Sequence, residues 1–371
     1  MPQRIGTVSI TPKVRDREGI PFPAFYDSFG KNTGNYMFTQ AMFRTLAGDV
    51  SHVGFAYDPD RINRDFDHIV VPAANWLNAG ANWDWLTDII ERTDIPVTVI
   101  GIGLQADTTD LAQVKVSDSA VRFIKAAARK SPLISTRGDF TRDWLHSIGV
   151  RNAVTTGCPS LYMRLDLPAE RSQPTDTFVV QSTRYAMTPG FLNATGANRR
   201  LFELSGRSDA WMVYQSEPEE LEYLACDRIP EGREAVFDDL LPPLYGQPDR
   251  QSLQAYLDRR GKVFFDLDEW AGFLQQTAGV IGTRLHGSII ALNADVPAVL
   301  VPHDSRTREV ADFAGIPVLT DLSRLDDQTF LREVLQDVDM SQFVAARTRN
   351  SDTYRSFLVE CGLRPNDARM F

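Results

Sequence analysis

A cationic and a titratable side chain stand together in one short segment of the sequence, VIGTRLHGSIIAL. Its first residues are typical of the end of a buried strand, and the apolar run from Ser288 onward predicts a helix. Arg284 and His286 fall between them, two residues apart, so in an extended segment their side chains would point the same way. Arginine presents a fork that matches a carboxylate or a phosphate, and histidine gives or takes a proton near neutral pH. The segment therefore predicts an anion site beside a general acid, although a surface arginine and a helix-capping histidine would give the same pattern.

Other residues near this segment would extend an anion site. Gly287 permits the close approach of a ligand, and free backbone N–H groups at a helix start near Ser288 would attract negative charge. The sequence PHDSRTR follows the next expected strand, which would place His303 and Arg306 at the same edge of the sheet. Arg184 comes just after the strand TFVVQ. Each of these residues could equally be an ordinary solvated side chain.

The first half of the chain offers polar loops at the ends of expected strands. The loop DSFGKNTGN contains Asn32, Gly34 and Asn35 before a helix, and it could hold sugar hydroxyls or only form a turn and a helix cap. Arg137 follows another strand, in STRGD. Trp76 lies among asparagines, a setting that suits a sugar ring, although a core tryptophan is the more common case.

Several other chemistries lack their sequence signatures. The sequence has no GxSxG, GxxxxGK[ST] or HExxH motif, and the GxG in GIGLQ stands outside a full dinucleotide fingerprint. The cysteines, Cys158, Cys226 and Cys361, form no CxxC pair, so zinc-site spacing is absent. Cys158, in GCPS, is expected to be packed rather than nucleophilic. We therefore expect neither a metal nor a cofactor.

The elements that must position these residues alternate between short apolar strands and amphipathic helices. Strands are expected at 7–10, 68–71, 97–100, 133–135, 153–155, 177–181, 210–214, 262–265, 279–282 and 298–301. Helices are expected at 35–46, 83–93, 117–130, 140–148, 217–226, 252–259, 269–277, 288–293, 307–314 and 340–363. This alternation predicts parallel sheets, in which ligands bind beyond the carboxyl ends of the strands.

The length of 371 residues exceeds what one ordinary core can hold. A proline- and charge-rich stretch, LDLPAERSQPTD, marks the expected boundary. We predict an α/β protein with two Rossmann-like, doubly wound domains facing a cleft, at residues 1–167 and 168–340. The last segment, residues 341–371, is expected to be helical and could pack back across the boundary. The turn-rich residues 230–247 could form a lid or an insertion.

Charge and hydropathy limit the kinds of partner that we expect for this protein. The formal net charge of −10 disfavours nucleic acid, because a phosphate backbone needs a basic face. No apolar run reaches the ~18 residues that a membrane-spanning helix needs. The N-terminus has no signal-peptide pattern, and sparse cysteines suit a reducing compartment. We expect a cytoplasmic protein, with peripheral contact to the inner face of the membrane left open.

The segment GTRLHG, after a VIG strand and before an apolar helix, resembles the RLH motif of polysaccharide pyruvyl transferases. The other motifs follow in that family's order: DSFGKNTGN resembles its glycine–asparagine loop, STRGD and GCPS its strand ends, VVQSTR its second arginine, and PAVLVPHDSRTREVADFAGIP its closing donor-site region. The resemblance spans roughly residues 25–320. Asn35 and Cys158 depart from it, since aspartate is common at both positions.

The resemblance implies a GT-B-like pair of domains that transfers pyruvate from phosphoenolpyruvate to a sugar of a bacterial polysaccharide or its precursor, forming a pyruvate ketal. Arg284 and Arg184 would hold the donor's phosphate and carboxylate, and His286 would protonate its methylene carbon. The C-terminal domain would carry the donor, and its further contacts would be Gly287, Ser288, His303 and Arg306. The N-terminal domain would carry the acceptor, with Asn32, Gly34, Asn35, Trp76 and Arg137.

Two other functions fit the same features. A glycosyltransferase with a nucleotide-sugar donor would share the fold and the arginines, and Glu217 or Asp266 could grip its ribose. A non-catalytic sugar- or anion-binding protein would use Arg284 and His286 without turnover. The sequence leaves open the acceptor sugar, its hydroxyl pair, its linkage to lipid and the oligomeric state.

Overall fold

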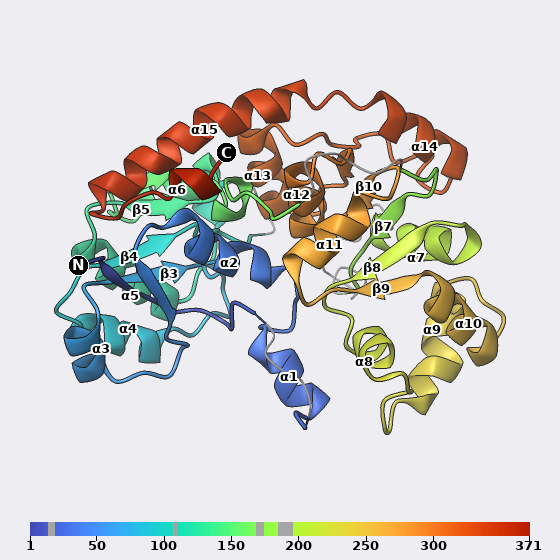
Figure 1. Cartoon of the computed structure of the whole chain (residues 1–371), viewed down its shortest axis with the longest axis horizontal. Coiled ribbons are helices and arrows are strands. Elements are labelled where there is room, and N and C mark those ends of the chain that lie inside the picture. Colours follow the sequence, from blue (N-terminus) through green and yellow to red (C-terminus); the bar gives the residue numbers. More distant parts are fainter. Residues whose placement is uncertain (14–18, 107, 109, 168–173, 185–195) are drawn as a thin grey trace.

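The computed structural model describes residues 1–13, 19–106, 108, 110–167, 174–184 and 196–371. Parallel strands alternate with helices through most of the chain, as the colours of Figure 1 show. The prediction of an α/β fold with parallel sheets is confirmed. The expected boundary after residue 167 adjoins residues 168–173, which lie outside the described residues. The division into domains therefore stays a prediction.

The first sheet has the strand order β2-β1-β3-β4, and all its pairs are parallel. The strands are β1 (Arg4–Thr7), β2 (Asp49–His52), β3 (His68–Pro72) and β4 (Val97–Ile100). Beyond the end of β4, Ile102 bridges to Thr136 of β5 (Ile134–Thr136), which pairs with β6 (Ala153–Thr155). Strands β3 and β4 are buried along their whole length. This burial explains their unbroken apolar sequences, because helices cover both faces of a parallel sheet.

In the described part of the first half, six α-helices accompany these strands. They are α1 (Phe22–Ser28), α2 (Asn35–Thr45), α3 (Pro59–Asp65), α4 (Asp84–Arg92), α5 (Asp118–Lys130) and α6 (Asp139–Ser147), with short 3₁₀ turns η1 (Leu111–Gln113) and η2 (Pro159–Leu161). Sequence analysis missed α1, α3 and β2 and placed β1 three residues late. Strand β2 lies at the edge of the sheet and is half exposed, so it lacks the apolar run that marks a buried strand.

The second sheet has the strand order β11-β10-β7-β8-β9 and is also parallel. Its strands are β7 (Val179–Gln181), β8 (Trp211–Tyr214), β9 (Gly261–Val263), β10 (Val280–Gly282) and β11 (Ala298–Leu300). The chain runs outward from β7 to β9 and then returns to the other side of β7. The strand order therefore reverses between β7 and β10, which is where ligands bind in doubly wound sheets.

The helices of the second half are α7 (Ala197–Arg207), α8 (Pro218–Cys226), η5 (Val236–Leu240), α9 (Leu241–Leu244), α10 (Arg250–Arg260), α11 (Leu267–Leu274), α12 (Leu285–Asn293), α13 (Ser305–Ala314) and α14 (Gln328–Asp337). The turn-rich residues 230–247 form η5, a π-helix, and α9, with Phe237, Leu241 and Tyr245 buried. The Tyr245 hydroxyl donates to Glu220 Oε1 at 2.8 Å. This segment is packed onto the second half of the chain.

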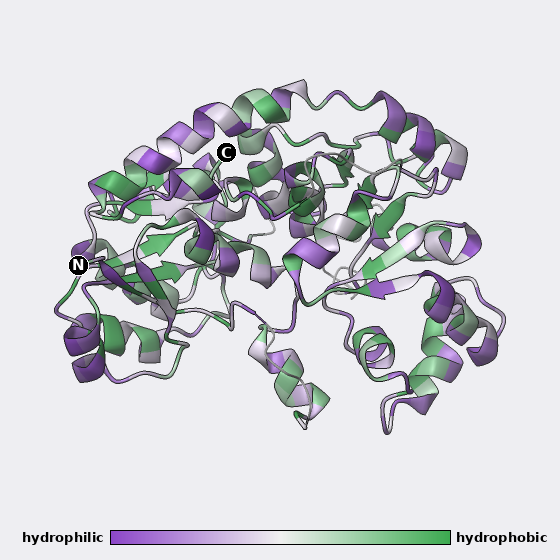
Figure 2. Ribbon diagram, viewed as in Figure 1, coloured by the Kyte–Doolittle hydropathy of each residue, from purple (hydrophilic) through white to green (hydrophobic). Residues whose placement is uncertain are grey.

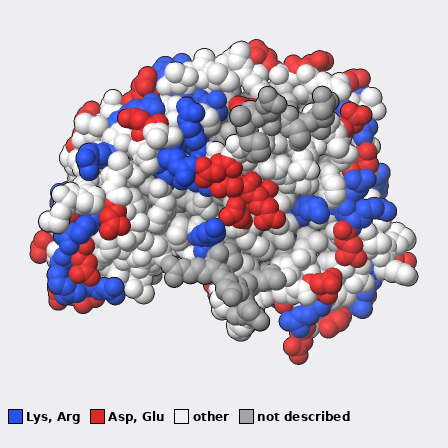
Figure 3. Space-filling model, viewed as in Figure 1, with Lys and Arg blue, Asp and Glu red and all other residues white. Residues whose placement is uncertain are grey.

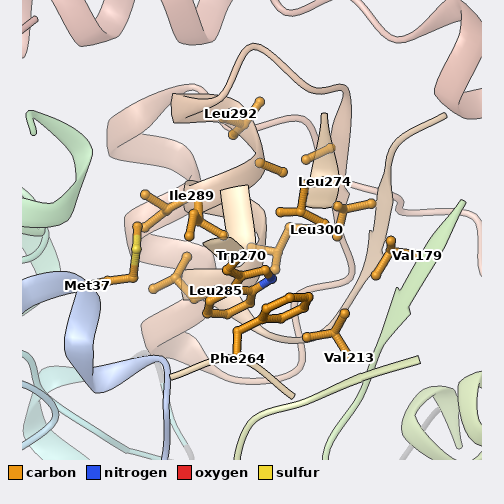
Figure 4. Close-up of a cluster of buried hydrophobic side chains, with 14 of the residues drawn as sticks. Met37, Val179, Val213, Phe264, Trp270, Leu274, Leu285, Ile289, Leu292 and Leu300 are labelled. Atoms are coloured by element: carbon orange, nitrogen blue, oxygen red, sulfur yellow. The ribbon is translucent and has the colours of Figure 1, made fainter. Parts of the chain in front are cut away.

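The core runs continuously between the two sheets. Figure 2 shows apolar residues along the strands and mixed polarity on the outer helices. In Figure 4, Trp270 of α11 and Ile289 of α12 lie over side chains of the second sheet, such as Val179. Met37 comes from α2, in the first half of the chain, and belongs to the same buried cluster. Helix α12 thus packs against elements of both halves.

The last helix, α15 (Ser341–Glu360), crosses the top of the molecule in Figure 1 and leads to η6 (Asp367–Arg369). Tyr354 of α15 stacks on Tyr162 with ring centroids 4.8 Å apart. Ala47 and Arg164 donate backbone hydrogen bonds to the carbonyls of Arg364 and Arg369, both at 2.8 Å. The C-terminal segment therefore lies against the first half of the chain.

Charged residues of both signs share the surface in Figure 3. Within the described ranges, no helix combines the length and the apolarity needed to cross a membrane.

Candidate active site

Polar residues follow four neighbouring strands of the second sheet at their carboxyl ends. Strand β7 leads into residues 182–184, β8 into 215–217, β10 into 283–286 and β11 into 301–304. These loops meet at one edge because the strands are parallel and adjacent. The edge includes the reversal of strand order between β7 and β10.

Helix α12 begins at Leu285, three residues earlier than the sequence predicted. Arg284 is its N-cap residue and His286 lies in its first turn, so the expectation that both side chains point the same way along an extended segment is wrong. The backbone N–H of Ser288 donates to Arg284 O at 3.1 Å, so it is not one of the free N–H groups expected to attract an anion.

Arg284 points toward the loops after β7 and β8. Its Nε donates to Ser182 O at 2.9 Å, and its Nη2 contacts Ser216 Oγ and Glu217 Oε1. The Glu217 carboxylate is fully buried and also accepts from the backbone N–H of Ser216 at 3.1 Å. Burial would raise the pKa of Glu217, but Arg284 and Arg184 outweigh it and hold the pKa below its ordinary value. The Glu217 carboxylate thus holds the Arg284 guanidinium in place.

Arg184 is held in the same manner by two glutamates in the first turn of α8. Its Nη2 contacts Glu219 Oε2 and lies 2.7 Å from Glu220 Oε2. Glu220 is fully buried, and that burial raises the pKa of its carboxyl group against the effect of Arg184. Both arginines are therefore held by carboxylates from residues 217–220, at or just after the start of α8.

His286 points instead toward elements of the first half. Its ring centroid lies 5.6 Å from that of Phe38 in α2, and its Nε2 lies 3.6 Å from Cys158 Sγ. Burial lowers the pKa of His286 well below its ordinary value, and the nearby cations Arg137 and Arg306 lower it further. The imidazole is therefore neutral at neutral pH.

Arg137 is also buried, with 2% of its surface exposed. Its Nε donates to Gly101 O at 2.8 Å and its Nη2 to Ala73 O at 3.1 Å. The guanidinium carbon lies 5.5 Å from the centroid of the Phe38 ring. Arg137 therefore supplies positive charge beside His286 from a position fixed by backbone carbonyls.

The loop after β11 adds His303, Asp304 and Arg306. Arg306 Nη2 lies 3.0 Å from Asp304 Oδ2, and His303 Nε2 lies 3.8 Å from the same oxygen. Asp304 also caps α13 by accepting from Thr307 N at 2.7 Å. The pKa of His303 is lowered to about 4, and burial is the main cause. Asp304 raises this pKa, whereas Arg306 and Arg284 lower it. His303 and Arg306 therefore meet at the same Asp304 carboxylate oxygen.

Four nitrogen atoms around this edge are buried and have no hydrogen-bond partner in the part of the chain that is described: Gln181 Nε2, Arg184 Nε, His303 Nδ1 and Arg306 Nε. An unsatisfied buried polar atom costs free energy of roughly 1–3 kcal/mol. Natural proteins keep few such atoms without a partner, so these nitrogens are candidates to contact a ligand or water.

Two glycines allow elements of the site to pack closely against one another. A Cβ atom on Gly287 would lie 1.4 Å from Gln181 Oε1, and one on Gly34 would lie 2.6 Å from Gln215 Oε1 and 3.2 Å from His286 Cβ. Gln215 Nε2 donates to Gln181 Oε1 at 2.8 Å, and Gln215 O accepts from Thr33 N at 2.8 Å. The loop before α2 therefore touches the strand ends of the second sheet.

The expected acceptor residues are only partly brought together. Asn32 Oδ1 accepts from Gly34 N at 2.9 Å, and Asn35 Nδ2 donates to Phe29 O and Gly30 O at 3.2 Å, so both side chains stabilise their own loop near His286. Trp76 stacks on Trp83, with ring centroids 4.2 Å apart, in a separate hydrophobic cluster of the first sheet. The environment of Trp76 is that of a half-buried packing residue, and its role toward the acceptor stays a prediction.

Sequence analysis missed several residues of this site. It proposed Glu217 only for a nucleotide ribose, and it did not single out Gln181, Ser216, Gln215, Phe38 or Glu309. Gln181, Gln215 and Ser216 end or follow strands, so the rule that found the arginines could have found them, whereas Phe38 and Glu309 lie inside helices.

Neither carboxylate proposed to grip a ribose is free. Glu217 pairs with Arg284, and Asp266 Oδ1 accepts from the backbone of Asp268 and Glu269 at the start of α11. Among the described residues, no three His, Cys, Asp or Glu side chains are grouped as metal ligands would be.

A family model described as polysaccharide pyruvyl transferase matches residues 32–305, more than half of the chain. This chain belongs to the polysaccharide pyruvyl transferase family. The resemblance drawn from GTRLHG and its neighbouring motifs is thereby confirmed. The family also gives the general activity, which is the transfer of a pyruvyl group to a polysaccharide. A search of curated proteins returned no match.

Several solved structures are similar over most of their length. One is UDP-N-acetylglucosamine 2-epimerase from Rickettsia bellii, with 10% identity, a TM-score of 0.48 and coverage of 97% of this chain and 96% of that one. Another is HepE of Anabaena in complex with UDP and glucose, with 10% identity, a TM-score of 0.46 and coverage of 97% of both chains. An uncharacterized protein from Klebsiella pneumoniae has 13% identity, a TM-score of 0.44 and coverage of 86% and 93%.

Proposed function

We propose that this transferase takes its pyruvyl group from phosphoenolpyruvate and joins it to two hydroxyls of one sugar as a pyruvate ketal. The observation that carries the proposal is the set of four buried nitrogen atoms at the strand ends, two of them on arginines, that have no hydrogen-bond partner among the described residues. Phosphoenolpyruvate has two anionic groups on a small skeleton, which suits several N–H donors aimed at one place.

The arginines already have carboxylate partners, so the donor would use the N–H groups that these ion pairs leave over. Arg284 is fixed by Glu217, Arg184 by Glu219 and Glu220, and Arg306 by Asp304. Such pairing holds each guanidinium in place before the ligand arrives. The unpartnered Nε atoms of Arg184 and Arg306 would then bond to phosphate or carboxylate oxygens.

His286 would deliver the proton to the methylene carbon of the donor. Protonation there leaves an oxocarbenium-like centre at the adjacent carbon, which one sugar hydroxyl attacks with loss of its proton. Departure of phosphate regenerates that centre, and the second hydroxyl closes the ketal. Fixed cations would stabilise the departing phosphate. No step uses a metal or a cofactor.

The sugar would approach from the first half of the chain. The loop before α2 and the buried Arg137 face His286, while the arginines 184 and 284 lie among the loops of the second sheet. The acceptor would be part of a bacterial polysaccharide or its precursor, and a lipid-linked precursor would bring the protein to the inner face of the membrane. Because phosphoenolpyruvate is a cytoplasmic metabolite, the reaction would take place in the cytoplasm.

The test is turnover with defined acceptors. The purified protein would be incubated with phosphoenolpyruvate and hexosides that carry adjacent or 4,6-related hydroxyl pairs, and phosphate release and the ketal methyl signal in NMR would be followed. We expect both signals with at least one acceptor. Turnover of a nucleotide sugar in place of phosphoenolpyruvate would overturn the proposal in favour of a glycosyltransferase.

A further inference from the structure

Cys158 lies in direct contact with His286. It stands just before η2, its surface is fully buried, and its Sγ is 3.6 Å from His286 Nε2. On its other side, Sγ is 3.0 Å from Ser160 Oγ. Ser160 is itself anchored, since its carbonyl accepts from Asn293 Nδ2 of α12 at 2.7 Å. The Ser160 hydroxyl, the Cys158 thiol and the His286 imidazole are therefore connected in that order.

The surroundings of His286 disfavour a stored imidazolium. The ring is buried, which disfavours its charged form, and the cations Arg137 and Arg306 act in the same direction. A neutral imidazole that gives up its only proton would become an anion, and imidazolate is far too basic to form in a protein at neutral pH. A relay in which a second group protonates the ring while the ring protonates the donor avoids this anion.

A thiol next to a fixed cation is such a group. Arg137 is held near Cys158, because its Nε donates to Gly101 O at 2.8 Å and a Cβ on Gly101 would lie 2.7 Å from Cδ of Pro159, the residue after Cys158. Cation contact stabilises a thiolate. The Ser160 hydroxyl can donate a hydrogen bond to the same sulfur. Both partners favour the charge that Cys158 would acquire.

Glu309 is an acidic group that also acts on Arg137, but both of its carboxylate oxygens accept hydrogen bonds from Thr141. Its Oε1 accepts from Thr141 Oγ1 at 2.8 Å and its Oε2 from Thr141 N at 3.2 Å. Within the described residues, the His286 ring forms its hydrogen bond with Cys158. Cys158 is therefore the better placed of the two.

We propose that Cys158 holds the proton that His286 delivers to the donor. This inference rests on the proposed function of the site. In the step, the S–H bond breaks and its proton passes to Nε2, while the Nδ1 proton passes to the methylene carbon. A thiolate remains beside Arg137. When the sugar hydroxyl attacks, its proton returns through the ring to the sulfur, so Cys158 ends the cycle as a thiol. Cys158 is thus a positioning residue that acts through His286.

The test compares Cys158→Ala and Cys158→Ser with Cys361→Ala. Cys361 is a matched control, because it is also buried but contacts Ser131 and Leu133 instead of the site. We expect kcat with phosphoenolpyruvate to fall about 10²-fold in both Cys158 variants and to stay within about twofold in the control, as for loss of a general-acid function. Serine is too weak an acid to restore the rate. The KM for phosphoenolpyruvate should change little, since the arginines remain.

A second readout is the tautomer of His286, followed by ¹⁵N NMR of the histidine-labelled protein and assigned with His286→Ala. We expect the Nε2 signal to shift in both Cys158 variants and to stay in place in Cys361→Ala. The inference is overturned if kcat and the His286 signals of Cys158→Ala equal those of Cys361→Ala. If the wild type does not turn over phosphoenolpyruvate, the proposed function fails by itself. The NMR comparison still decides whether Cys158 sets the state of His286.

Discussion

At the scale of single residues, two side chains that are close in the sequence point in different directions. Arg284 turns toward carboxylates and carbonyls of the second sheet, and His286 turns toward Phe38 and Cys158 of the first half. The divergence follows from the helical turn that begins between them. Binding of the donor and transfer of the proton are therefore expected to be separable by mutation.

Glu309 offers a residue-scale prediction about pH. Burial raises the pKa of its carboxyl group to about 7 from 4.5, although hydrogen bonds from Thr141 oppose the shift. Between these two pH values the native state binds more protons than the unfolded state, so this group makes the protein less stable as pH rises through the window. A Glu309→Gln variant does not titrate and loses this dependence.

We therefore expect the difference in melting temperature, Glu309→Gln minus wild type, to become more positive between pH 5 and pH 8. Differential scanning fluorimetry at both pH values measures it. A difference that stays constant, or becomes more negative, would show that Glu309 does not hold a raised pKa.

At the scale of elements, the sequence predicted buried strands well and helix starts less well. Strands β4 and β6 are placed as predicted because short apolar runs mark them. The start of α12 was misplaced because Gly287 weakens a helical pattern. The structure explains this glycine: Gln181 occupies the place of its side chain, and Gln181 lies more than a hundred residues earlier. A single sequence does not contain that contact.

A single sequence likewise does not contain the long-range contacts of the candidate site. The strand-end rule predicted Arg184, Arg284 and His303, since parallel strands present their following loops at one edge. It could not predict that Glu217, Glu219 and Glu220 fix the arginines, because that pairing depends on which strands are neighbours.

Gly287 provides an element-scale prediction. Gly287→Ala would drive a methyl group into Gln181, so we expect either a loss of stability of about 1–3 kcal/mol or a displaced Gln181 with weaker donor binding. Gly272→Ala in α11 is the control, because a Cβ there meets nothing within 4 Å. Urea denaturation of both variants measures the effect. Equal stability of the two, with equal donor affinity, would refute the tight contact.

At the scale of the whole molecule, the site depends on contacts between the two halves of the chain. Thr33 N donates to Gln215 O, Asn293 Nδ2 donates to Ser160 O, and Thr141 donates to Glu309. The last helix adds to these contacts, because α15 follows the second sheet and packs on the first half. The geometry of the candidate site therefore depends on contacts between both halves of the chain.

Helix α15 gives a prediction at this scale. Tyr354 is fully buried on Tyr162, whereas Val344 of the same helix is 47% exposed. Tyr354→Ala should cost about 3–5 kcal/mol of unfolding free energy and lower the stability of both halves together. Val344→Ala should change it by less than about 0.5 kcal/mol. Chemical denaturation followed by tryptophan fluorescence tests this, and a similar small loss in both variants would contradict it.

The central claim is that Arg284 and its neighbours bind phosphoenolpyruvate while His286 acts only in the reaction. Isothermal titration calorimetry of phosphoenolpyruvate, and of a UDP-sugar for comparison, into the wild type, His286→Ala, Arg284→Ala and Arg284→Lys tests it most directly. Arg284→Lys keeps a cation beside Glu217, so it controls for misfolding that an unpaired buried carboxylate would cause. The account predicts similar binding of phosphoenolpyruvate by wild type and His286→Ala, and affinity at least about tenfold lower in both Arg284 variants. Tight binding of the UDP-sugar alone, or unchanged phosphoenolpyruvate binding in the Arg284 variants, would contradict it.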